Sequence, residues 1–286
     1  MKYLGLFVGM TTLDFIYLSE RYPQANQKVV AQDYLTVAGG PATNAAVAFS
    51  YFGNRGKLLS VFGQNPLNQL IRADLEDYPV EIVDLMPERT VSPPVSSIIV
   101  TEATGERSVI SINAQKFQAN NSQIPQEILD RIDIVLIDGH QLPVSLAIAI
   151  AAKERQIPVV VDGGSWKPGL EKVLPFIDYA VCSANFYPPQ CRNREDVFDY
   201  LQAMNISQIA ITGGERPIQY FERGKKDTIP VPSVKAVDTL GAGDIFHGAF
   251  CHYILQADFS TALTQAAQIA SKSCQYFGTR DWYRNR

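Results

Sequence analysis

IDIVLIDGHQLPVSLAIAIAAKERQIPVVV, residues 132–161, contains two short apolar runs joined by a segment of helical length. The runs are 132–137 and 157–161, and the segment between them, 142–155, is long enough for a helix. A similar cycle follows at residues 179–182, 195–204 and 208–212. Continuous apolar strands joined by helices predict a parallel sheet that is covered on both faces. Such sheets bind ligands beyond the carboxyl ends of their strands, so we expect functional residues in the loops that follow strands.

The amino-terminal part of the chain has a different pattern. After a first strand near residues 3–9, residues 12–38 alternate between apolar and polar side chains, which predicts exposed strands. A second strand-rich patch, 96–113, contains Thr104-Gly105-Glu106-Arg107, a sequence typical of a hairpin turn. We therefore expect one α/β domain over residues 1–286, a doubly wound, mostly parallel sheet flanked by helices. The patches at about 12–38 and 96–113 would form a small β-sheet lid.

The composition is that of an ordinary globular protein, with 286 residues, 46% hydrophobic residues and a net charge of −4. Disorder, collagen and miniprotein scaffolds are excluded. No block of like charge favours nucleic acid or a membrane surface, so a small-molecule partner is expected.

The four irregularly spaced cysteines indicate reduced thiols. Residues 1–10 are interpreted as a buried strand rather than a signal peptide, and the apolar stretch 142–152 is too short to cross a bilayer. These features predict a soluble, cytoplasmic protein.

Residues 237–250 read VDTLGAGDIFHGAF, a loop of small residues that runs into a helix with apolar periodicity. Small residues allow the backbone to approach a ligand closely. Free N–H groups at the start of that helix would favour negative charge, such as that which develops in phosphoryl transfer. Asp244, in the first helical turn, would be placed to accept the proton of an attacking hydroxyl. Alternatively, Gly241 and Gly243 only shape a tight turn and Asp244 caps the helix.

Two known nucleotide motifs are missing from the sequence. It contains neither G-x-x-x-x-G-K-[ST] nor G-x-G-x-x-G, which argues against P-loop NTPases and simple Rossmann dehydrogenases.

Residues 38–48, AGGPATNAAVA, form a second glycine-rich segment before a helix of small residues. The two glycines and the proline predict another close approach of the backbone at a helix start. Asn44, about one turn inside this helix, has an amide that can donate to and accept from a sugar hydroxyl. A local backbone hydrogen bond is the alternative for an isolated Asn. Asp14 could accept hydrogen bonds from two vicinal hydroxyls, or it could be a turn residue.

In their order and separation, Asp14, the segment 39–46 and residues 238–244 resemble the ribokinase-like (PfkB) family of sugar kinases, over nearly the whole chain. Within the family, Arg21-Tyr22-Pro23, residues 102–108 and Lys272-Ser273-Cys274 look most like ketohexokinases and related fructokinases. The resemblance implies a ribokinase-like fold and a kinase that uses ATP and Mg²⁺. It also implies that the γ-phosphate passes to a sugar hydroxyl, with a ketohexose such as fructose as the acceptor.

The resemblance also implies roles for individual residues. Asp244 matches the general base, and the backbone of Gly241, Ala242 and Gly243 matches an anion hole around the transferring phosphoryl group. Residues 266–278 are expected to flank the adenine, and a dependence on a monovalent cation near Asp238 stays open. The remaining matches are the sugar ligands Asp14, Gly39, Gly40 and Asn44, the lid arginine Arg107, and the nucleotide-binding positions Asn185, Thr212, Gly214, Gly241 and Gly243.

Three prolines depart from the family pattern. Pro188 replaces the Glu of the Asn-x-x-Glu motif that starts at Asn185, so no metal ligand is assigned; ketohexokinases also lack that motif. Pro41 stands where ketohexokinases have a sugar-contacting Asn, and Pro217 replaces the second glycine of the nucleotide loop. Two alternatives therefore stay open, a nucleoside kinase of the same family and a non-catalytic relative that senses a sugar or a nucleotide.

The histidines and Asp162 can be explained without a role in the reaction. The three histidines, His140, His247 and His252, have no metal-ligand spacing and are expected to be structural or surface groups. Asp162, in a glycine-rich strand end, either lines the cleft or shapes its loop.

An exposed lid has unpaired strand edges and an apolar face, so we expect a homodimer in which two lids pack together.

Overall fold

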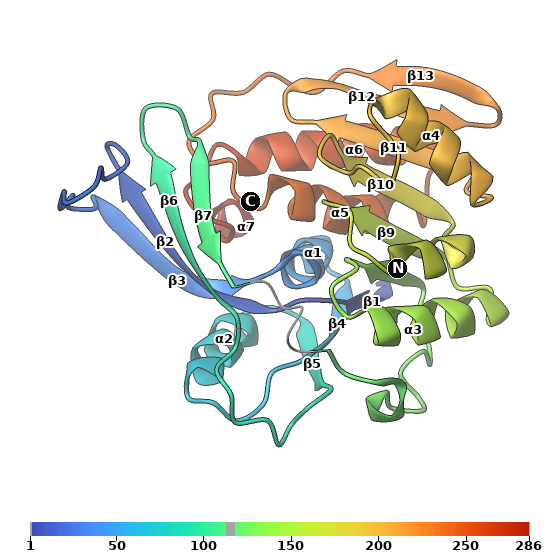
Figure 1. Cartoon of the computed structure of the whole chain (residues 1–286), viewed down its shortest axis with the longest axis horizontal. Coiled ribbons are helices and arrows are strands. Elements are labelled where there is room, and N and C mark those ends of the chain that lie inside the picture. The colour runs from blue at the N-terminus through green and yellow to red at the C-terminus, as the bar shows by residue number, and fades with distance from the viewer. Residues whose placement is uncertain (1, 113–117, 286) are drawn as a thin grey trace.

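The computed structural model describes residues 2–112 and 118–285, and its body is a nine-stranded sheet with helices on both faces (Figure 1). The strand order is β13-β12-β11-β10-β9-β8-β1-β4-β5. The seven strands from β11 to β5 are parallel, and β12 and β13 add an antiparallel hairpin at one edge. This confirms the predicted doubly wound sheet. The strands are β1 (Leu4–Val8), β4 (Arg55–Ser60), β5 (Val80–Asp84), β8 (Ile134–Ile137), β9 (Val159–Gly163), β10 (Tyr179–Ser183), β11 (Gln208–Gly213), β12 (Arg216–Glu222) and β13 (Lys225–Ile229).

Helices cover the two faces because each central strand is apolar on both sides. Alternate residues of β8 point in opposite directions, so Val135 packs in the core with α3 and α4, and Leu136 packs in the core with α1, α5 and α6. No helix in the described parts of the chain is long and apolar enough to cross a membrane. The helices are α1 (Pro41–Ser50), α2 (Leu67–Glu76), α3 (Leu142–Glu154), α4 (Arg194–Ala203), α5 (Ala242–Tyr253), α6 (Phe259–Ser273) and α7 (Asp281–Arg284).

A separate four-stranded sheet projects from the body, formed from the two predicted patches (Figure 1). Its order is β3-β2-β6-β7; β2 and β6 are parallel, whereas the other two pairs are antiparallel. One face packs Ile16 and Ile98 against Leu240 and Phe277 of the body. Asn113, the predicted end of the second patch, lies outside the described residues. The strands are β2 (Thr12–Ser19), β3 (Asp33–Gly39), β6 (Val95–Thr101) and β7 (Arg107–Ser111).

Helices α1 and α5 pack closely, and this contact positions the two sequence motifs. Gly248 of α5 faces the backbone of α1, since a Cβ at this position would lie 2.3 Å from the carbonyl oxygen of Ala45. A larger residue here would push the helices apart. Both helices begin near the carboxyl edge of the sheet, where Asp138, after β8, accepts hydrogen bonds from the N–H of Met10 and of Ala42. The two motifs therefore meet at the edge where ligands of parallel sheets bind.

Candidate active site

Asp244 and Asn44 are in direct contact. The Asn44 amide nitrogen donates to the Asp244 carboxylate over 2.8 Å, between the first turns of α1 and α5. Gly241 is the residue that caps α5, and no side chain caps this helix end. The alternative that Asp244 is a helix cap is therefore wrong. Burial, and then the nearby charge of Asp162, raise the pKa of Asp244 to about 7, although the Asn44 hydrogen bond and the charges of His247 and Arg107 oppose that rise.

The segment that leads into Asp244 is shaped by glycine and contains backbone N–H groups without an acceptor. Gly241 has φ 71°, and a Cβ there would lie 2.7 Å from the Thr279 methyl group, so glycine is required. Apart from its chain neighbours and the backbone of its own helix, no atom of the described residues lies within 4 Å of a Cβ placed at Gly243. In the described parts of the chain, no acceptor contacts the N–H of Gly243 or Asp244. Free N–H groups at a helix start, beside open space, fit a phosphoryl group.

Asp14 lies on β2, rather than in a turn, on the face of the small sheet that points to the body. Its carboxylate accepts a 2.6 Å hydrogen bond from Thr12 Oγ1, and burial raises its pKa. Gly39 leaves the space that Asp14 occupies, because a Cβ there would lie 1.9 Å from Asp14 Oδ2. Gly40 has φ 98° and starts α1. The predicted sugar-binding residues are thus neighbours, and they share one side of the site with Asn44.

Arg280 joins these groups, although no local pattern in the sequence marks it. Its side chain is 2% exposed. It donates to Asn44 Oδ1 over 2.9 Å, to the carbonyl oxygen of Ala38 over 2.6 Å and to Asp74 over 3.2 Å. A guanidinium only donates, so it selects the oxygen of the Asn44 amide and leaves the nitrogen to face Asp244. Arg280 therefore orients the residue that contacts Asp244.

The lid hairpin contacts the loop before α5. Arg107 donates to the carbonyl oxygen of Thr239 over 2.9 Å and to its hydroxyl over 3.1 Å. In turn, Thr239 donates through its N–H and its hydroxyl to the carbonyl oxygen of Gly105. The guanidinium lies near enough to lower the pKa of Asp244. The sequence pattern alone indicates a solvated turn for Arg107, whereas the resemblance implies a contact with the phosphates or the sugar; the structure shows Arg107 in contact with Thr239 in the loop before α5.

The predicted nucleotide-binding residues lie on neighbouring strand ends. Thr212 is in β11 and donates to the carbonyl oxygen of Cys182, and Gly214 follows with φ 66°. Asn185 follows β10 and donates its N–H to the hydroxyl of Ser183. No hydrogen bond joins these three residues to the Asp244 loop within 2–112 and 118–285. They lie at the same sheet edge as the site but form a separate group.

Two acidic residues at strand ends are part of the carboxyl edge. Asp138 directly follows β8. The expectation that functional residues lie in the loops after strands could therefore have identified it from the sequence. Asp162 is the residue before the last in β9, and its carboxylate lies 3.5 Å from Nδ1 of His247 on α5. Asp238 accepts from the N–H of Leu240 and of Gly278, each over 2.8 Å, which closes the loop before α5. Among the described residues, no three His, Cys, Asp or Glu side chains are grouped to hold a metal ion.

The family model described as "pfkB family carbohydrate kinase" matches residues 5–285. The chain belongs to this family. A ribokinase of Bacillus subtilis is 24% identical over 282 residues, which cover 96% of this kinase and 93% of the relative. The structure of a ribokinase from Giardia lamblia superposes with a TM-score of 0.82 at 16% identity and covers 100% of this chain and 98% of the other. An Arabidopsis thaliana ribokinase complexed with ribose and ATP has a TM-score of 0.75 at 21% identity, with 97% and 94% covered.

These findings confirm the predicted family and the ribokinase-like fold. The kinase is an ATP-dependent phosphotransferase with an alcohol group as acceptor, of the carbohydrate or nucleoside kinase type. The finer resemblance to ketohexokinases and fructokinases has no support in these relatives, which are ribokinases by name. Local segments such as 102–108 therefore do not determine the subgroup.

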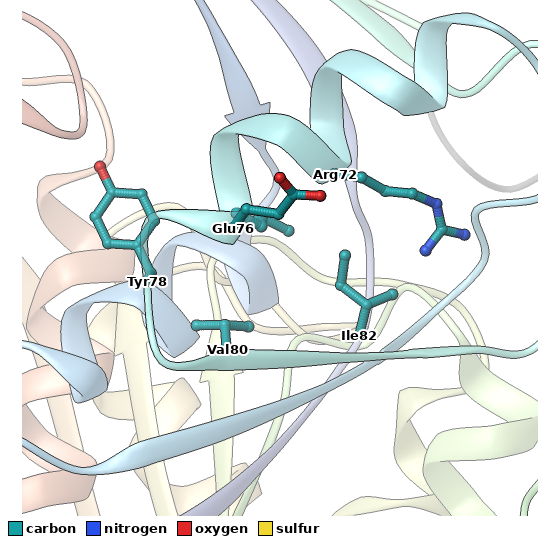
Figure 2. Close-up of a pocket in the computed structure, with 6 residues that line it drawn as sticks. Arg72, Glu76, Tyr78, Val80 and Ile82 are labelled. Carbon is teal, nitrogen blue, oxygen red and sulfur yellow. The ribbon is translucent and has the colours of Figure 1, made fainter.

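A hollow of about 260 Å³ lies apart from this site, between α2 and β5 (Figure 2). Its lining includes Arg72, Glu76 and Tyr78, with Val80 and Ile82 of β5. Val80 begins β5, so the hollow extends toward the amino end of that strand, away from the carboxyl edge that holds Asp244. The hollow is therefore separate from the residues grouped around Asp244.

Proposed function

We propose that this kinase transfers the γ-phosphate of ATP to a hydroxyl of a small free sugar, with Asp244 as general base. The observation that carries the proposal is the buried Asp244 carboxylate, held by Asn44 beside backbone N–H groups that have no acceptor. A base with a pKa near 7 can take a proton at neutral pH and release it again. A helix cap or a purely structural carboxylate would require neither backbone N–H groups without an acceptor beside it nor a pKa near 7.

The reaction follows from these positions. Asp244 accepts the hydroxyl proton while the sugar oxygen attacks the γ-phosphorus, and the bond from this phosphorus to the bridging oxygen of ADP breaks. The backbone of Gly241, Ala242 and Gly243 surrounds the transferring group and stabilises its charge. Mg²⁺ bound to the ATP phosphates would neutralise part of their charge, and since Mg²⁺ keeps several waters it needs no cage of protein ligands.

The sugar would lie between the small sheet and α1. Asp14 offers a carboxylate, and Gly39 and Gly40 let the backbone approach the sugar. Asn44 uses one N–H on Asp244, and its second N–H is available to a hydroxyl. Residues 1–286 would act as one domain, with about 12–38 and 96–113 as its lid. Closure of the lid, with Arg107 as its contact to the phosphates or the sugar, would exclude water and limit hydrolysis of ATP.

ATP would lie along the ends of β10 and β11. Asn185, Thr212 and Gly214 would contact its phosphates and ribose, and residues 266–278 would flank the adenine. Pro188 leaves this edge without the Glu of the family motif, so Mg²⁺ would depend on the phosphates more than on a protein carboxylate. A titration of turnover with K⁺ and Na⁺ tests a cation dependence near Asp238, whose oxygens both accept backbone hydrogen bonds.

A panel of acceptors tests the proposed reaction. Purified protein with Mg-ATP should phosphorylate a pentose such as ribose or 2-deoxyribose, the class favoured by the ribokinase relatives, more efficiently than fructose. Fructose and nucleosides in the panel test the ketohexose acceptor and the nucleoside-kinase alternative. Asp244→Asn should bind the sugar and ATP but lose turnover. If the wild-type protein binds a sugar or a nucleoside and phosphorylates nothing, it is a sensor rather than a kinase.

We also propose a homodimer in which the outer faces of two lids pack together. Side-chain alternation places Tyr34 and Ile110 on the face opposite Ile16 and Ile98, and they are 67% and 78% exposed. Ile110→Asp should give a monomer in light scattering at micromolar concentration. Val91→Asp changes an aliphatic side chain that is 56% exposed and outside both lid patches, so it should leave the dimer intact. A monomeric wild-type protein would contradict the proposal.

A further inference from the structure

His247 lies one helical turn after Gly243 on α5 and is 5% exposed. Its Nδ1 lies 2.7 Å from the carbonyl oxygen of Gly243. Its Nε2 lies 3.0 Å from the carbonyl oxygen of Val181 on β10. Both ring nitrogens therefore face backbone oxygens at hydrogen-bond distance, one in the first turn of α5 and one in the central sheet.

This geometry determines the protonation of the ring. A carbonyl oxygen can only accept a hydrogen bond, so each ring nitrogen must donate. A neutral imidazole carries one N–H and one lone pair, and either tautomer would aim the lone pair at an oxygen 2.7 or 3.0 Å away. Only the imidazolium, with a proton on both nitrogens, satisfies both contacts. The arrangement is that of a buried cation.

A buried cation needs an anion, and Asp162 supplies it. The Asp162 carboxylate lies 3.5 Å from Nδ1, and both side chains are 6% exposed. No other cation lies within ion-pair distance of Asp162 in the described parts of the chain. A buried pair of this kind persists because removal of either partner would leave the other charge unpaired in a medium of low polarity.

We propose that His247 is held as an imidazolium by Asp162 and two carbonyl oxygens, and that this pair is a positioning device for the base Asp244. The ring anchors the carbonyl of Gly243 to the central sheet, which fixes the start of α5. The two charges of the pair act on Asp244 in opposite directions, because a cation favours its ionised form and an anion disfavours it. The inference rests on the proposed role of Asp244 as general base.

Other charged or titratable groups lie near His247, Asp162 and Asp244. Arg107 of the lid also acts on Asp244, and His140 faces Asp162 from the loop after β8. Burial keeps the neighbouring thiols protonated, since it raises the pKa of Cys182 and of Cys251. In the described parts of the chain, the charged and titratable groups that face the pair or Asp244 include Asp162, His247, Arg107 and His140, with Cys182 and Cys251 neutral.

Nitrogen NMR of the histidine rings tests the protonation without any activity measurement. The chain has three histidines. Burial lowers the pKa of His140, and it lowers the pKa of His252 to about 4, so both rings should be neutral at pH 7.5. One ring of the three should therefore show two protonated nitrogens. Its signals should disappear in His247→Asn and persist in His140→Gln and His252→Gln. Three neutral rings at pH 7.5 would overturn the proposal, whatever the enzyme does.

The pH dependence of kcat/KM tests the positioning role. His247→Asn removes the cation and should move the acidic limb upward by about one pH unit. Asp162→Asn removes the anion, is nearly isosteric, and should move the limb downward by a similar amount. If the pair were purely structural, both variants would lose kcat/KM without these opposite shifts of the acidic limb. That result would refute the positioning role. If His247→Asn does not fold, Asp162→Asn and the ring spectra still decide. If Asp244→Asn keeps its turnover, the proposed base fails, while the imidazolium is tested separately.

Discussion

Asp244→Asn should inactivate the enzyme and also stabilise its fold. In the folded protein, burial raises the pKa of Asp244 from the ordinary 3.8 to about 7. Above pH 3.8 the unfolded chain releases this proton, whereas the folded protein retains it until about pH 7. The unfolded state then binds fewer protons, so stability falls as the pH rises through this window. Asn stays neutral and avoids that loss while it still offers an oxygen to Asn44.

The size of the effect follows from the same values. The interval of 7 − 3.8 = 3.2 pH units, at about 1.36 kcal/mol per unit, gives an upper bound of about 4 kcal/mol at pH 8. The variant should therefore exceed the wild type in free energy of unfolding at pH 8, and the difference should approach zero near pH 4. Turnover should fall by about 10²–10⁴-fold, the range for loss of a general base.

Urea unfolding at pH 4, 6 and 8 measures this difference, with turnover measured on the same samples. Asp258→Asn is the matched control, because it removes a carboxylate at the exposed start of α6 and keeps an equally good helix cap. The control should retain turnover and show no gain in stability at pH 8. If Asp244→Asn is no more stable than the wild type at pH 8, with an unchanged m-value, the carboxylate does not destabilise the fold and the argument fails.

Three further predictions concern the same site. The kcat/KM of the wild type should fall about 100-fold between pH 8 and pH 5, because Asp244 gains a proton near pH 7; a flat profile would contradict its assignment as base. Arg280→Met should lower the free energy of unfolding by about 3–5 kcal/mol in urea, because Asp74 stays buried without its partner. Arg284→Met, at an exposed ion pair, is its control, and equal losses in both would refute this account. Arg107→Ala should lower kcat/KM about tenfold while the melting temperature changes little, since Arg107 stabilises charge at the site; unchanged kinetics would remove it from the site.

The strand pattern was enough to predict the large sheet, because buried parallel strands are recognisable from short apolar runs. The pairing in the small sheet was not predictable in the same way. Alternation indicates that β2 and β6 are strands, but their parallel pairing joins segments separated by α1, β4, α2 and β5. That pairing depends on how the body folds between them, which no local pattern encodes.

The site shows the same division between local and distant information. The positions of Asp244 and Asn44 in the first turns of two helices were predictable from the small-residue loops before them, whereas their roles were implied only by the family resemblance. Arg280 was not, since its contact with Asn44 joins positions 236 residues apart and forms only when the chain returns to α1. His247 was interpreted as a structural or surface group because it lacks metal-ligand spacing. Its actual partners are two backbone oxygens and Asp162, which sequence spacing cannot identify.

The placement of the buried cations explains how an acidic protein can hold ATP. The net charge of −4 repels an anion weakly, and the buried Arg280 and His247 already contact Asp74 and Asp162. Neither cation is therefore free to bind phosphate. On the proposed function, the N–H groups at the start of α5 and Arg107, which donates to Thr239 in the loop before that helix, would supply part of the attraction. Backbone donors are fixed before ATP arrives, so on the proposed mechanism they would stabilise the charge of the transferring phosphoryl group without reorganisation.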